Sequence, residues 1–410
     1  MKARRVVVTG MGVITPLGND VASFWEALCA GQSGVGPITA FDASRFASRI
    51  AAEVRDFAPP PEIEPRDVKQ MDRFALFGLS AALQAFRQSA LAESGFDPNR
   101  AGVVIGSSHG GEVSLLREAS ALEQPGGHGV SPWAVPRMLA NMASAQVAIH
   151  FGLHGPSFTL GSACATGAQA IGEAASVIRR GDADVMLCGG AEACITTLTI
   201  AGDDASGALS RRNDAPEEAS RPFDVGRDGF VLGEGAGVLV IEELGHARRR
   251  DATILAELVG YGATTDAVHV TRPDPSGQHA ARAMSLAFAQ AAMSPSDVDV
   301  VFAHATSTQA GDRAEARALA VALGDIALTT PVTAIKSSLG HLLGAAGAVQ
   351  AIAAIMALRT GVVPPTRNLE VRDLACPLNI VTGHAPSLSL RCVLTNAFGF
   401  GGHNVSLVFL

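Results

Sequence analysis

One cysteine stands where a strand is predicted to give way to a helix. Cys164 lies in the sequence SACATG, after an apolar run that ends at Leu160 and before a stretch of small residues typical of a helix. The unpaired N–H groups at the start of a helix, together with the positive end of its dipole, favour the thiolate form of such a cysteine. The pattern therefore indicates that Cys164 is a nucleophile that forms a covalent intermediate.

The other five cysteines are expected to be packing residues with free thiols. Their spacing is not typical of a disulfide framework, and no CxxC pair offers the geometry of a zinc site. We therefore expect no bound metal and a reducing, cytoplasmic environment. These five residues are Cys29, Cys188, Cys194, Cys376 and Cys392.

Two histidines occupy turns of the same kind as Cys164. His304 follows the predicted strand at 298–303 in the sequence HATST, and His341 follows the predicted strand at 331–335 in the sequence KSSLGH. The same ends of parallel strands meet at one edge of a sheet. We therefore expect Cys164, His304 and His341 to converge on one pocket.

Charged residues close to these histidines are candidates for positioning them. Asp312 and Glu315 follow His304 and share one face of a predicted helix, while Lys336 precedes His341. Either carboxylate could pair with Lys336 or orient a histidine. The alternative is that both carboxylates are ordinary solvated charges.

A glycine-rich segment near the end of the chain completes the candidate site. Its sequence, NAFGFGGHN at 396–404, permits unusual backbone angles. A backbone N–H in this loop could contribute to an oxyanion hole. Phe400, within the loop, is a candidate for a movable apolar gate.

A competing motif points to a different chemistry. Residues 106–110 read GSSHG after a predicted strand and match GxSxG, so a hydrolase with Ser108 as its nucleophile is the alternative interpretation. The sequence GMG at 10–12 lacks the third glycine of a dinucleotide fingerprint, and no phosphate-binding GxxxxGK[ST] occurs. The sequence therefore does not indicate a nucleotide cofactor.

The composition is that of a large globular protein with few charges. Of 410 residues, 48% are hydrophobic and 17% are charged, with a net charge of −8 and no runs of Lys or Arg. This argues against nucleic acid or an anionic membrane as the main partner. The longest weakly polar stretch, 342–358, is shorter than the roughly 20 residues that a membrane span needs.

Alternating segments and a weak repeat predict the fold. Short β-branched runs alternate with longer Ala/Leu-rich stretches, which is typical of α/β architecture with buried sheets. At a shift of 180 residues, Gly167 and Ala168 coincide with Gly347 and Ala348. We therefore predict a duplicated unit, with an N-terminal half over 1–250 that carries the nucleophile and a C-terminal half over 251–410 that carries the histidine pair.

Taken together and in this order, the motifs resemble the elongating β-ketoacyl-[acyl-carrier-protein] synthases of the thiolase superfamily. The similarity runs from VVVTGMGVITPLG at the start, through SACATG, RPFDVGRDGFVLGEGAG, HATST and KSSLGH, to GFGGHN. It implies the family's duplicated five-layered α-β-α-β-α fold and a dimer. It also implies substrates carried on the phosphopantetheine arm of an acyl carrier protein, with no further cofactor.

The resemblance implies a mechanism position by position. Cys164 would accept the acyl chain from the carrier protein. Malonyl-carrier protein would then lose CO₂ in a decarboxylative Claisen condensation, with His304 and His341 donating N–H groups to the enolate oxygen. The backbone N–H groups of Cys164 and Phe400 would form the oxyanion hole.

Further residues take supporting roles by the same resemblance. Lys336 and Glu315 would support the histidine pair. The phosphopantetheine arm would bind Thr306, Thr308 and Thr271. An acidic carrier protein would dock on a basic face that includes the residues Arg66 and Lys69.

Two positions depart from the family pattern. His109 and Asp203 stand, with the Phe400 gate, where the family lines the acyl tunnel, and these two positions are normally apolar. Burying a carboxylate or imidazole beside an alkyl chain costs about 1–3 kcal/mol or more unless the group is hydrogen-bonded. The pocket is therefore expected to suit a polar or unsaturated polyketide chain, unless both side chains turn outward.

Two pathways would use these same catalytic residues. The chain elongates fatty acids as a homodimer, or it is the catalytic subunit of a reducing, polyene-type type II polyketide synthase. In the second case it pairs with a homologous chain-length subunit that lacks the cysteine. A cysteine at 164 rather than glutamine predicts the catalytic subunit, and the Cys-His-His set is typical of the elongating class.

Overall fold

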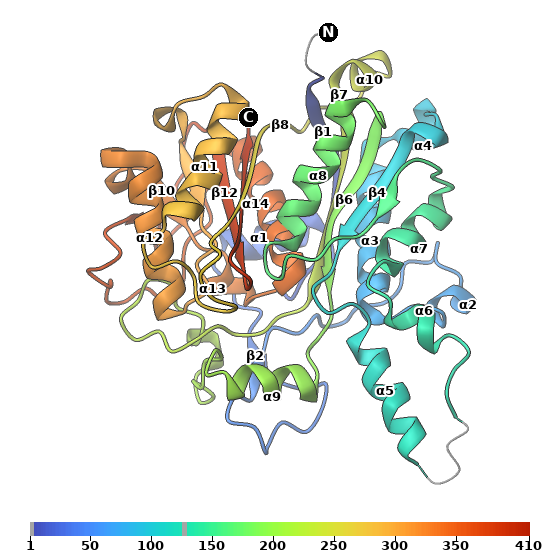
Figure 1. The fold of residues 1–410 in the computed structure, drawn as a ribbon, viewed down its shortest axis with the longest axis horizontal. Helices are drawn as coiled ribbons and strands as arrows, with labels where there is room; N and C mark the ends of the chain where they lie inside the picture. Colours follow the sequence, from blue (N-terminus) through green and yellow to red (C-terminus); the bar gives the residue numbers. More distant parts are fainter. Residues whose placement is uncertain (1–3, 125–128) are drawn as a thin grey trace.

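The computed structural model describes residues 4–124 and 129–410, in which strands and helices alternate along the chain (Figure 1). The strands are β1 Val6–Ile14, β2 Gly36–Pro37, β3 Ile50–Ala51, β4 Ala101–Gly106, β5 Ser157–Phe158, β6 Val185–Glu192, β7 Gly235–Glu243, β8 Ala256–Thr265, β9 Val300–Phe302, β10 Pro331–Thr333, β11 Asn379–Ile380, β12 Val393–Gly399 and β13 His403–Phe409. The helices are α1 Val21–Cys29, α2 Pro65–Val68, α3 Arg73–Ser89, α4 Leu91–Ser94, α5 Glu112–Glu123, α6 Ala134–Met138, α7 Met142–Phe151, α8 Thr166–Arg180, α9 Thr197–Ala205, α10 Leu244–Arg249, α11 Gln278–Ala291, α12 Gln309–Leu323, α13 Lys336–Leu339 and α14 Ala346–Thr360.

The main sheet is built from two repeats of one topology. Its strand order is β11-β10-β9-β12-β13-β8-β1-β7-β6-β4-β5. From the centre of the sheet outward, the first half has the order β1-β7-β6-β4-β5, and its successive pairs are antiparallel, antiparallel, parallel and parallel. The second half has the order β8-β13-β12-β9-β10 with the same pair directions. The strands of the two halves also follow one another along the chain in the same way. β1 and β8 join the two repeats as an antiparallel pair. The predicted duplicated α/β fold is therefore confirmed, and residue 250 falls between α10 and β8.

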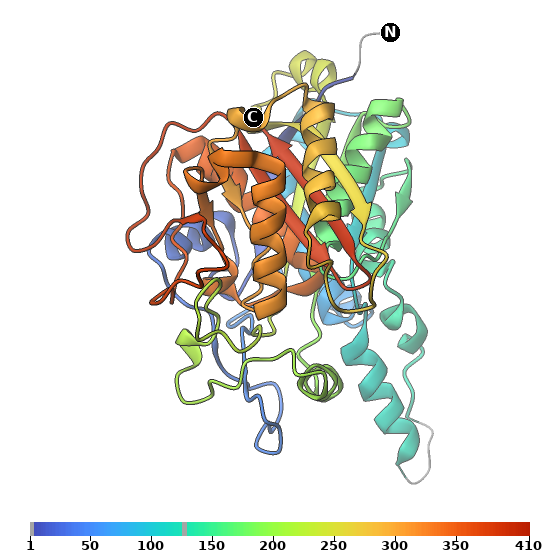
Figure 2. The same cartoon turned by 60° about the vertical axis from the view of Figure 1, so that its left-hand side comes forward.

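Helices cover both faces of each half of the sheet. The central helices α8 and α14 pack against each other and lie between the two halves, with α3 and α7 outside the first half and α11 and α12 outside the second (Figures 1 and 2). This gives the five layers α-β-α-β-α. Along β7, Val238 and Val240 pack in the cluster that includes α3, whereas Leu239 and Ile241 pack in the central cluster. Burial on both faces explains why the strands are continuously apolar.

Glycines allow two close approaches that shape these layers. In β1, a Cβ on Gly10 or Gly12 would lie 2.0 Å from the carbonyl oxygen of Ala85 or Ala81 in α3. The GMG sequence thus serves the packing of strand on helix. In the centre, a Cβ on Gly167 of α8 would lie 2.9 Å from the backbone nitrogen of Ala348.

The crossing of α8 and α14 is nearly symmetric. A Cβ on Gly347 of α14 would lie 2.7 Å from the backbone nitrogen of Ala168 and 2.9 Å from its Cβ. The residues that coincide at the 180-residue shift are therefore the ones that meet where the central helices cross. Since α8 follows Cys164 and α14 follows His341 in the chain, this crossing brings the two together.

The segment Leu343–Thr360, which contains α14, is apolar and long enough by composition to span a membrane. However, 78% of it is buried inside the fold, as expected for the core helix of a protein of this architecture.

Replacing Gly347 with alanine tests the helix crossing. Alanine favours a helix over glycine by up to about 1 kcal/mol, but its Cβ would overlap α8. We expect a net loss of about 1–3 kcal/mol in the free energy of unfolding, measured by denaturant titration.

The matched control is Gly202→Ala in α9, where a Cβ meets nothing within 4 Å. We expect this variant to be unchanged or more stable by about 0.5–1 kcal/mol. Equal effects of the two substitutions would show that the crossing is not tightly packed.

Candidate active site

Cys164 lies in a sharp turn between β5 and α8. The residue before it, Ala163, has a positive φ of 50°, which is strained for a residue other than glycine. The Ser162 N–H donates to Thr166 Oγ1 at 2.8 Å and fixes the turn to the first residue of α8. The side chain of Cys164 is buried and lines a cavity of about 600 Å³.

The cavity brings together the three residues that the sequence singled out for chemistry. His304 and His341 line it with Cys164. Their rings meet edge to face, with centroids 5.5 Å apart and an angle of 85° between the planes. Phe230 contacts His341 and Phe398 contacts His304, at centroid distances of 5.4 Å and 5.6 Å, so aromatic rings limit the positions of both imidazoles.

Both imidazoles are neutral and incompletely hydrogen-bonded. Burial, together with the positive charge of Lys336, holds the pKa of His304 and of His341 well below its usual range. Within the described residues, neither ring nitrogen of His341 has a hydrogen-bond partner, and Nδ1 of His304 has none. A buried polar group without a partner is rare in a folded protein. Each ring can therefore offer one N–H to a ligand in the cavity.

Glu315 holds the backbone at His304 from α12. Its Oε1 accepts the N–H of His304 at 2.8 Å, and its Oε2 accepts the N–H of Ala305 at 2.7 Å. These bonds support Ala305 in a left-handed conformation with φ of 29°. Burial raises the pKa of the Glu315 carboxyl, while the two N–H donors lower it.

Lys336 acts on the same turn from the other side. Its Nζ donates to the carbonyl oxygen of His304 at 2.5 Å and to Gln350 Oε1 at 3.4 Å. Burial lowers the pKa of Lys336 to about 8, and the charge of Glu315 raises it. No ion pair joins Lys336 to Glu315 within the part of the chain that the structure describes. The two residues instead position His304 through its main chain.

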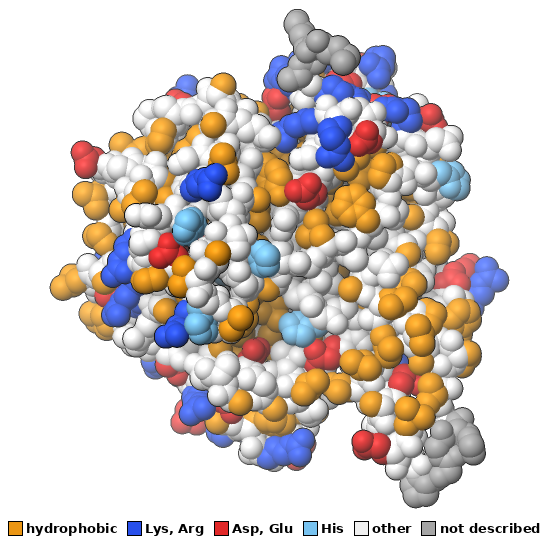
Figure 3. Space-filling model, viewed as in Figure 1, with side chains coloured by type: hydrophobic (Ala, Val, Ile, Leu, Met, Phe, Trp, Pro, Cys, Tyr) orange, Lys and Arg blue, Asp and Glu red, His pale blue; other side chains and the backbone are white. Residues whose placement is uncertain are grey.

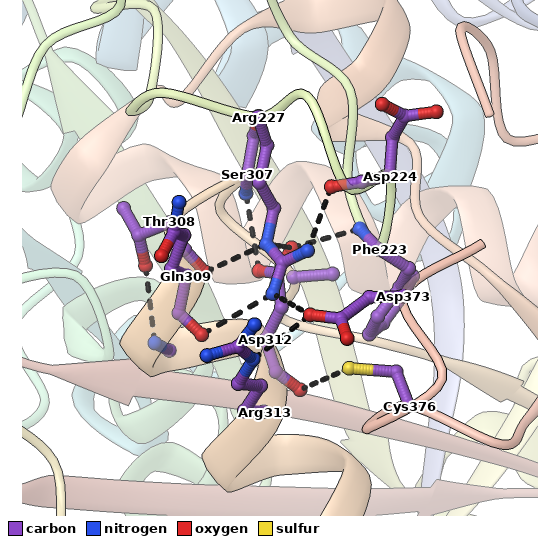
Figure 4. A network of polar contacts seen from close by, with 12 residues as sticks. Phe223, Asp224, Arg227, Ser307, Thr308, Gln309, Asp312, Arg313, Asp373 and Cys376 are labelled. Carbon is purple, nitrogen blue, oxygen red and sulfur yellow. Dashed lines mark hydrogen bonds and ion pairs between the residues drawn. The ribbon is translucent and has the colours of Figure 1, made fainter. Parts of the chain in front are cut away.

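Asp312 anchors the loop that follows His304 (Figure 4). Its carboxylate accepts the N–H groups of Phe223 and Ser307, at 2.8 and 3.1 Å, and lies 3.2 Å from Nε of Arg227. Arg227 is itself fully buried and also pairs with Asp373 at 2.9 Å. Burial raises the pKa of Asp312 to about 7. Asp312 and Glu315 are therefore buried structural groups, and the interpretation as solvated charges is wrong.

Sequence reasoning missed one more buried carboxylate, that of Glu192 at the end of β6. It accepts the Ser107 hydroxyl at 2.8 Å and the N–H groups of Ser108, His109 and Gly344, at 2.8, 3.1 and 3.0 Å. It thus ties the loop after β4 to the loop after His341. A glutamate directly after the buried strand sequence VMLCGGA was the signal available in the sequence.

The alternative hydrolase with Ser108 as nucleophile is not supported. The Ser108 hydroxyl donates to the carbonyl oxygen of Ala163 at 2.9 Å, so it braces the turn that precedes Cys164. Among the described residues, no histidine ring nitrogen hydrogen-bonds to this hydroxyl. The serine therefore lacks the base that a nucleophile of this kind requires.

The glycine-rich loop after β12 packs directly on the start of α8. A Cβ on Gly399 would lie 2.4 Å from the carbonyl oxygen of Ser162 and 3.1 Å from the nitrogen of Cys164. The backbone N–H of the next residue, Phe400, lies close enough to the Cys164 thiol to lower its pKa. The Phe400 side chain lines the cavity and is 42% exposed.

The resting thiol differs from the sequence-based expectation. Burial raises the pKa of Cys164 to about 12, with smaller increases from Glu192 and Asp203, while Lys336 and the Phe400 N–H lower it. The expectation of a resting thiolate is therefore wrong, because burial raises the pKa of the thiol. The cysteine rests as a thiol, and its proton must leave during the reaction.

The other predicted residues divide between the cavity and the surface. Exposure increases from the buried Cys164, through half-buried Thr306 and Thr308, to exposed Thr271, and all four line the cavity. The two threonine hydroxyls at 306 and 308 lie 3.1 Å apart. This gradient outlines a route from solvent to the thiol.

His109 and Asp203 also line the cavity. Arg66 in α2 and Lys69 directly after it are exposed and do not line the cavity. On the face that contains α8, Figure 3 shows histidine side chains gathered near the middle and Lys and Arg side chains near the upper edge.

One group of side chains has ligand atoms close enough to hold a metal ion. The ligand atoms of His109, Glu192 and Cys194 lie within 4.8 Å of one another. Glu192, however, already accepts hydrogen bonds from four donors on both of its oxygens. Its lone pairs are therefore committed to the protein, and the group fits a metal ion poorly.

Comparisons with known proteins agree with this geometry. The family described as "Beta-ketoacyl synthase, N-terminal domain" matches residues 3–247, and its C-terminal domain matches residues 255–370. The 3-oxoacyl-[acyl-carrier-protein] synthase 2 of Coxiella burnetii is 47% identical over 408 residues, covering 100% of this chain and 99% of the relative. Its counterpart in Synechocystis is 45% identical over 409 residues, covering 100% and 98%.

Solved structures show the same fold. A β-ketoacyl synthase from Burkholderia phymatum superposes with a TM-score of 0.93 at 37% identity, with 99% of each chain covered. The ishigamide ketosynthase/chain length factor superposes with a TM-score of 0.92 at 35% identity, also over 99% of each chain. A type II polyketide ketosynthase bound to its acyl-carrier protein gives a TM-score of 0.91 at 33% identity, covering 100% of this chain and 99% of that one.

The resting protonation state of Cys164 can be measured by alkylation. Because only the thiolate reacts, we expect the rate of iodoacetamide labelling of Cys164 to rise about tenfold per pH unit up to about pH 8. Lys336, with its pKa of about 8, loses a charge that favours the thiolate as the pH rises further, so the increase becomes less steep above about pH 8.

Peptide mass spectrometry identifies the labelled residue, with Cys164→Ala as the control. A rate that levels off below about pH 8 would show that the helix N-terminus outweighs burial.

Proposed function

Since this chain belongs to the β-ketoacyl synthase family, we propose that Cys164 carries the growing acyl chain and that His304 and His341 act on the extender unit. The protein is a β-ketoacyl-[acyl-carrier-protein] synthase, an acyltransferase of fatty-acid or polyketide biosynthesis. The observation that carries the assignment of roles is the shared cavity, in which two neutral histidines with unpartnered nitrogens face the same space as one cysteine.

The first step is acyl transfer to Cys164. Its sulfur attacks the thioester carbonyl of the acyl-carrier protein, and the pantetheine thiol leaves with the proton that the cysteine loses. The N–H groups of Cys164 and Phe400 stabilise the oxyanion of the tetrahedral intermediate. Support for this arrangement comes from the Phe400 N–H, which lies close enough to the thiol to lower its pKa, and from Gly399, whose Cβ position lies 3.1 Å from the nitrogen of Cys164.

The second step is decarboxylative condensation. Malonyl-carrier protein loses CO₂, and the electron pair of the broken bond forms an enolate whose oxygen accepts N–H groups from His304 and His341. Its carbon attacks the acyl carbonyl, and Cys164 leaves as the thiolate and regains a proton. Neutral imidazoles suit this role because each retains an N–H donor without a charge to desolvate. Glu315 and Lys336 hold the His304 backbone and are positioning residues.

The carrier protein supplies the substrates on its phosphopantetheine arm, so the reaction needs no other cofactor. We propose that the arm enters past Thr271 and hydrogen-bonds to Thr306 and Thr308, along the gradient of exposure described above. The exposed cations Arg66 and Lys69 attract an acidic carrier protein and mainly affect its association rate. The reaction takes place in the cytoplasm.

A second subunit fits the surface formed by α5, α6 and α7 and by the edge strand β5. Figure 3 shows hydrophobic side chains over the right and lower right of this face. The exposed apolar residues in these elements are Leu115, Leu122, Val135, Ile149 and Phe158. Such a patch, next to a strand with one unpaired edge, is typical of a protein interface. We propose a homodimer or a heterodimer with a homologue that lacks the cysteine.

The pathway has two candidates. Relatives named 3-oxoacyl-[acyl-carrier-protein] synthase 2 at 43–47% identity favour fatty-acid elongation. His109 and Asp203 in the cavity favour the second candidate, the catalytic subunit of a type II polyketide synthase that handles less apolar chains.

Acylation of Cys164 is the first test. Incubation with an acyl-carrier protein should add the mass of the acyl group to the wild-type protein and to Ser108→Ala, and should add nothing to Cys164→Ala. Intact-mass spectrometry measures the adduct. An adduct lost in Ser108→Ala but kept in Cys164→Ala would contradict the proposed nucleophile.

The two histidines can be separated from the nucleophile. In His304→Ala and in His341→Ala we expect condensation with malonyl-carrier protein to fall by about 10²–10³-fold in kcat, because each substitution removes one donor to the enolate oxygen. Acylation of Cys164, measured by mass in the same variants, should change far less. Variants that lose acylation and condensation in equal measure would show that the histidines instead act in the first step.

A further inference from the structure

One wall of the cavity is polar. Ser108 and His109 reach it from the loop after β4, and Asp203 and Ser206 reach it from the end of α9. The neighbouring charge of His109 lowers the pKa of Asp203, and the charge of Asp203 raises the pKa of Cys164. This polar wall, defined by residues 108, 109, 203 and 206, therefore lies close enough to act on a chain attached to Cys164.

Two of the four side chains in the polar wall, those of Asp203 and His109, have no hydrogen-bond partner among the described residues, whereas the two serines have one each. The hydroxyls of Ser108 and Ser206 donate to the carbonyl oxygens of Ala163 and Asp203, at 2.9 and 2.8 Å. The Asp203 carboxylate accepts no hydrogen bond from the described residues, and Nδ1 of His109 comes no closer than 3.9 Å to a carboxylate oxygen of Glu192. The wall therefore presents an unused acceptor and an imidazole to the cavity.

The residue next to Asp203 shows how a carboxylate on this helix is normally satisfied. Asp204 accepts hydrogen bonds from the Arg211 guanidinium at 2.9 Å and from the Ala47 N–H at 3.2 Å, and it does not line the cavity. Asp203 has no such partners among the described residues. Its partner must come from the contents of the cavity.

Apolar side chains line other parts of the cavity. Phe230, Leu343, Ala208 and Phe398 line the same cavity. Burial raises the pKa of Asp203 to about 6, with a further increase from Glu112 and a decrease from His109. An alkyl chain that displaced water from this carboxylate would leave it without any donor, which is unfavourable. A chain with an O–H group at this point would satisfy it.

We propose that the polar wall selects acyl chains that carry a hydroxyl group, whose O–H donates to Asp203 and whose oxygen accepts an N–H from His109. The alkyl part of such a chain packs against the apolar walls. This inference rests on the proposed function, because the chain is the one delivered to Cys164.

The test compares acyl-carrier proteins whose chains have one length and carry either no hydroxyl or one hydroxyl at successive positions. The rate of Cys164 acylation is measured by intact mass for each chain. We expect at least one hydroxylated chain to load about tenfold or more faster than the unsubstituted chain. In Asp203→Leu this preference should fall by about tenfold, to near equal loading of the two chains, because a site built for a hydrogen bond discriminates strongly against its absence.

Two further variants separate the hydrogen bond from charge and folding. Asp203→Asn retains an acceptor and should keep part of the preference. Asp204→Asn removes one charge from the same helix outside the cavity, and it should leave the preference unchanged.

The outcomes distinguish this inference from the proposed function. If the wild-type protein loads the unsubstituted chain best, or if Asp203→Leu keeps the wild-type ratio, the inference is wrong while loading of Cys164 still supports the proposed function. If no chain loads on Cys164 of the folded protein, both are wrong.

Discussion

The close crossing of α8 and α14 determines where Cys164 and His341 lie relative to each other. Gly167 and Gly347 leave no side chain between the two helices, so each backbone packs against an alanine of the other. Both helices are buried between the two halves of the sheet, and each begins shortly after a residue of the site, Cys164 or His341. A larger residue at the crossing would move both starting points at once, since packed interiors transmit such shifts. The duplication thus supplies the fold and the meeting point together.

Buried carboxylates then fix the loops that extend from this crossing. Glu192 ties the loop after β4 to the loop after His341, Glu315 holds the turn at His304, and Asp312 with Arg227 holds the segment that follows. Each carboxylate accepts backbone N–H groups, which offsets the cost of burying its charge. These carboxylates act through the hydrogen bonds that they accept from the protein, although Glu315 also lines the cavity. Their contribution to catalysis is to keep the cysteine and histidines in place.

The sequence predicted the elements that depend on local pattern. Cys164 and His304 each follow a strand and precede a helix, whereas the short helix α13 separates His341 from β10. The small residues shared by the two repeats are the ones that meet at the helix crossing. The roles of Glu192 and Arg227 were not predicted, because their partners lie 85 and 146 residues away in the chain. The prediction that Cys164 rests as a thiolate was wrong for a related reason. Helix position is local, whereas burial is a property of the whole fold.

The structure separates groups that are satisfied from groups that are left open. Behind the site, Glu192, Glu315 and Asp312 have their oxygens occupied by donors of the protein. Facing the cavity, the imidazole nitrogens of His341 have no partner among the described residues. Because an unmet hydrogen bond in a buried site costs free energy, such groups persist where a ligand completes them. Asp203, a partly exposed carboxylate that lines the cavity without a hydrogen-bond partner among the described residues, extends this view to the chain on Cys164. The open polar groups of the cavity thus describe both the extender that reacts and the chain that it extends.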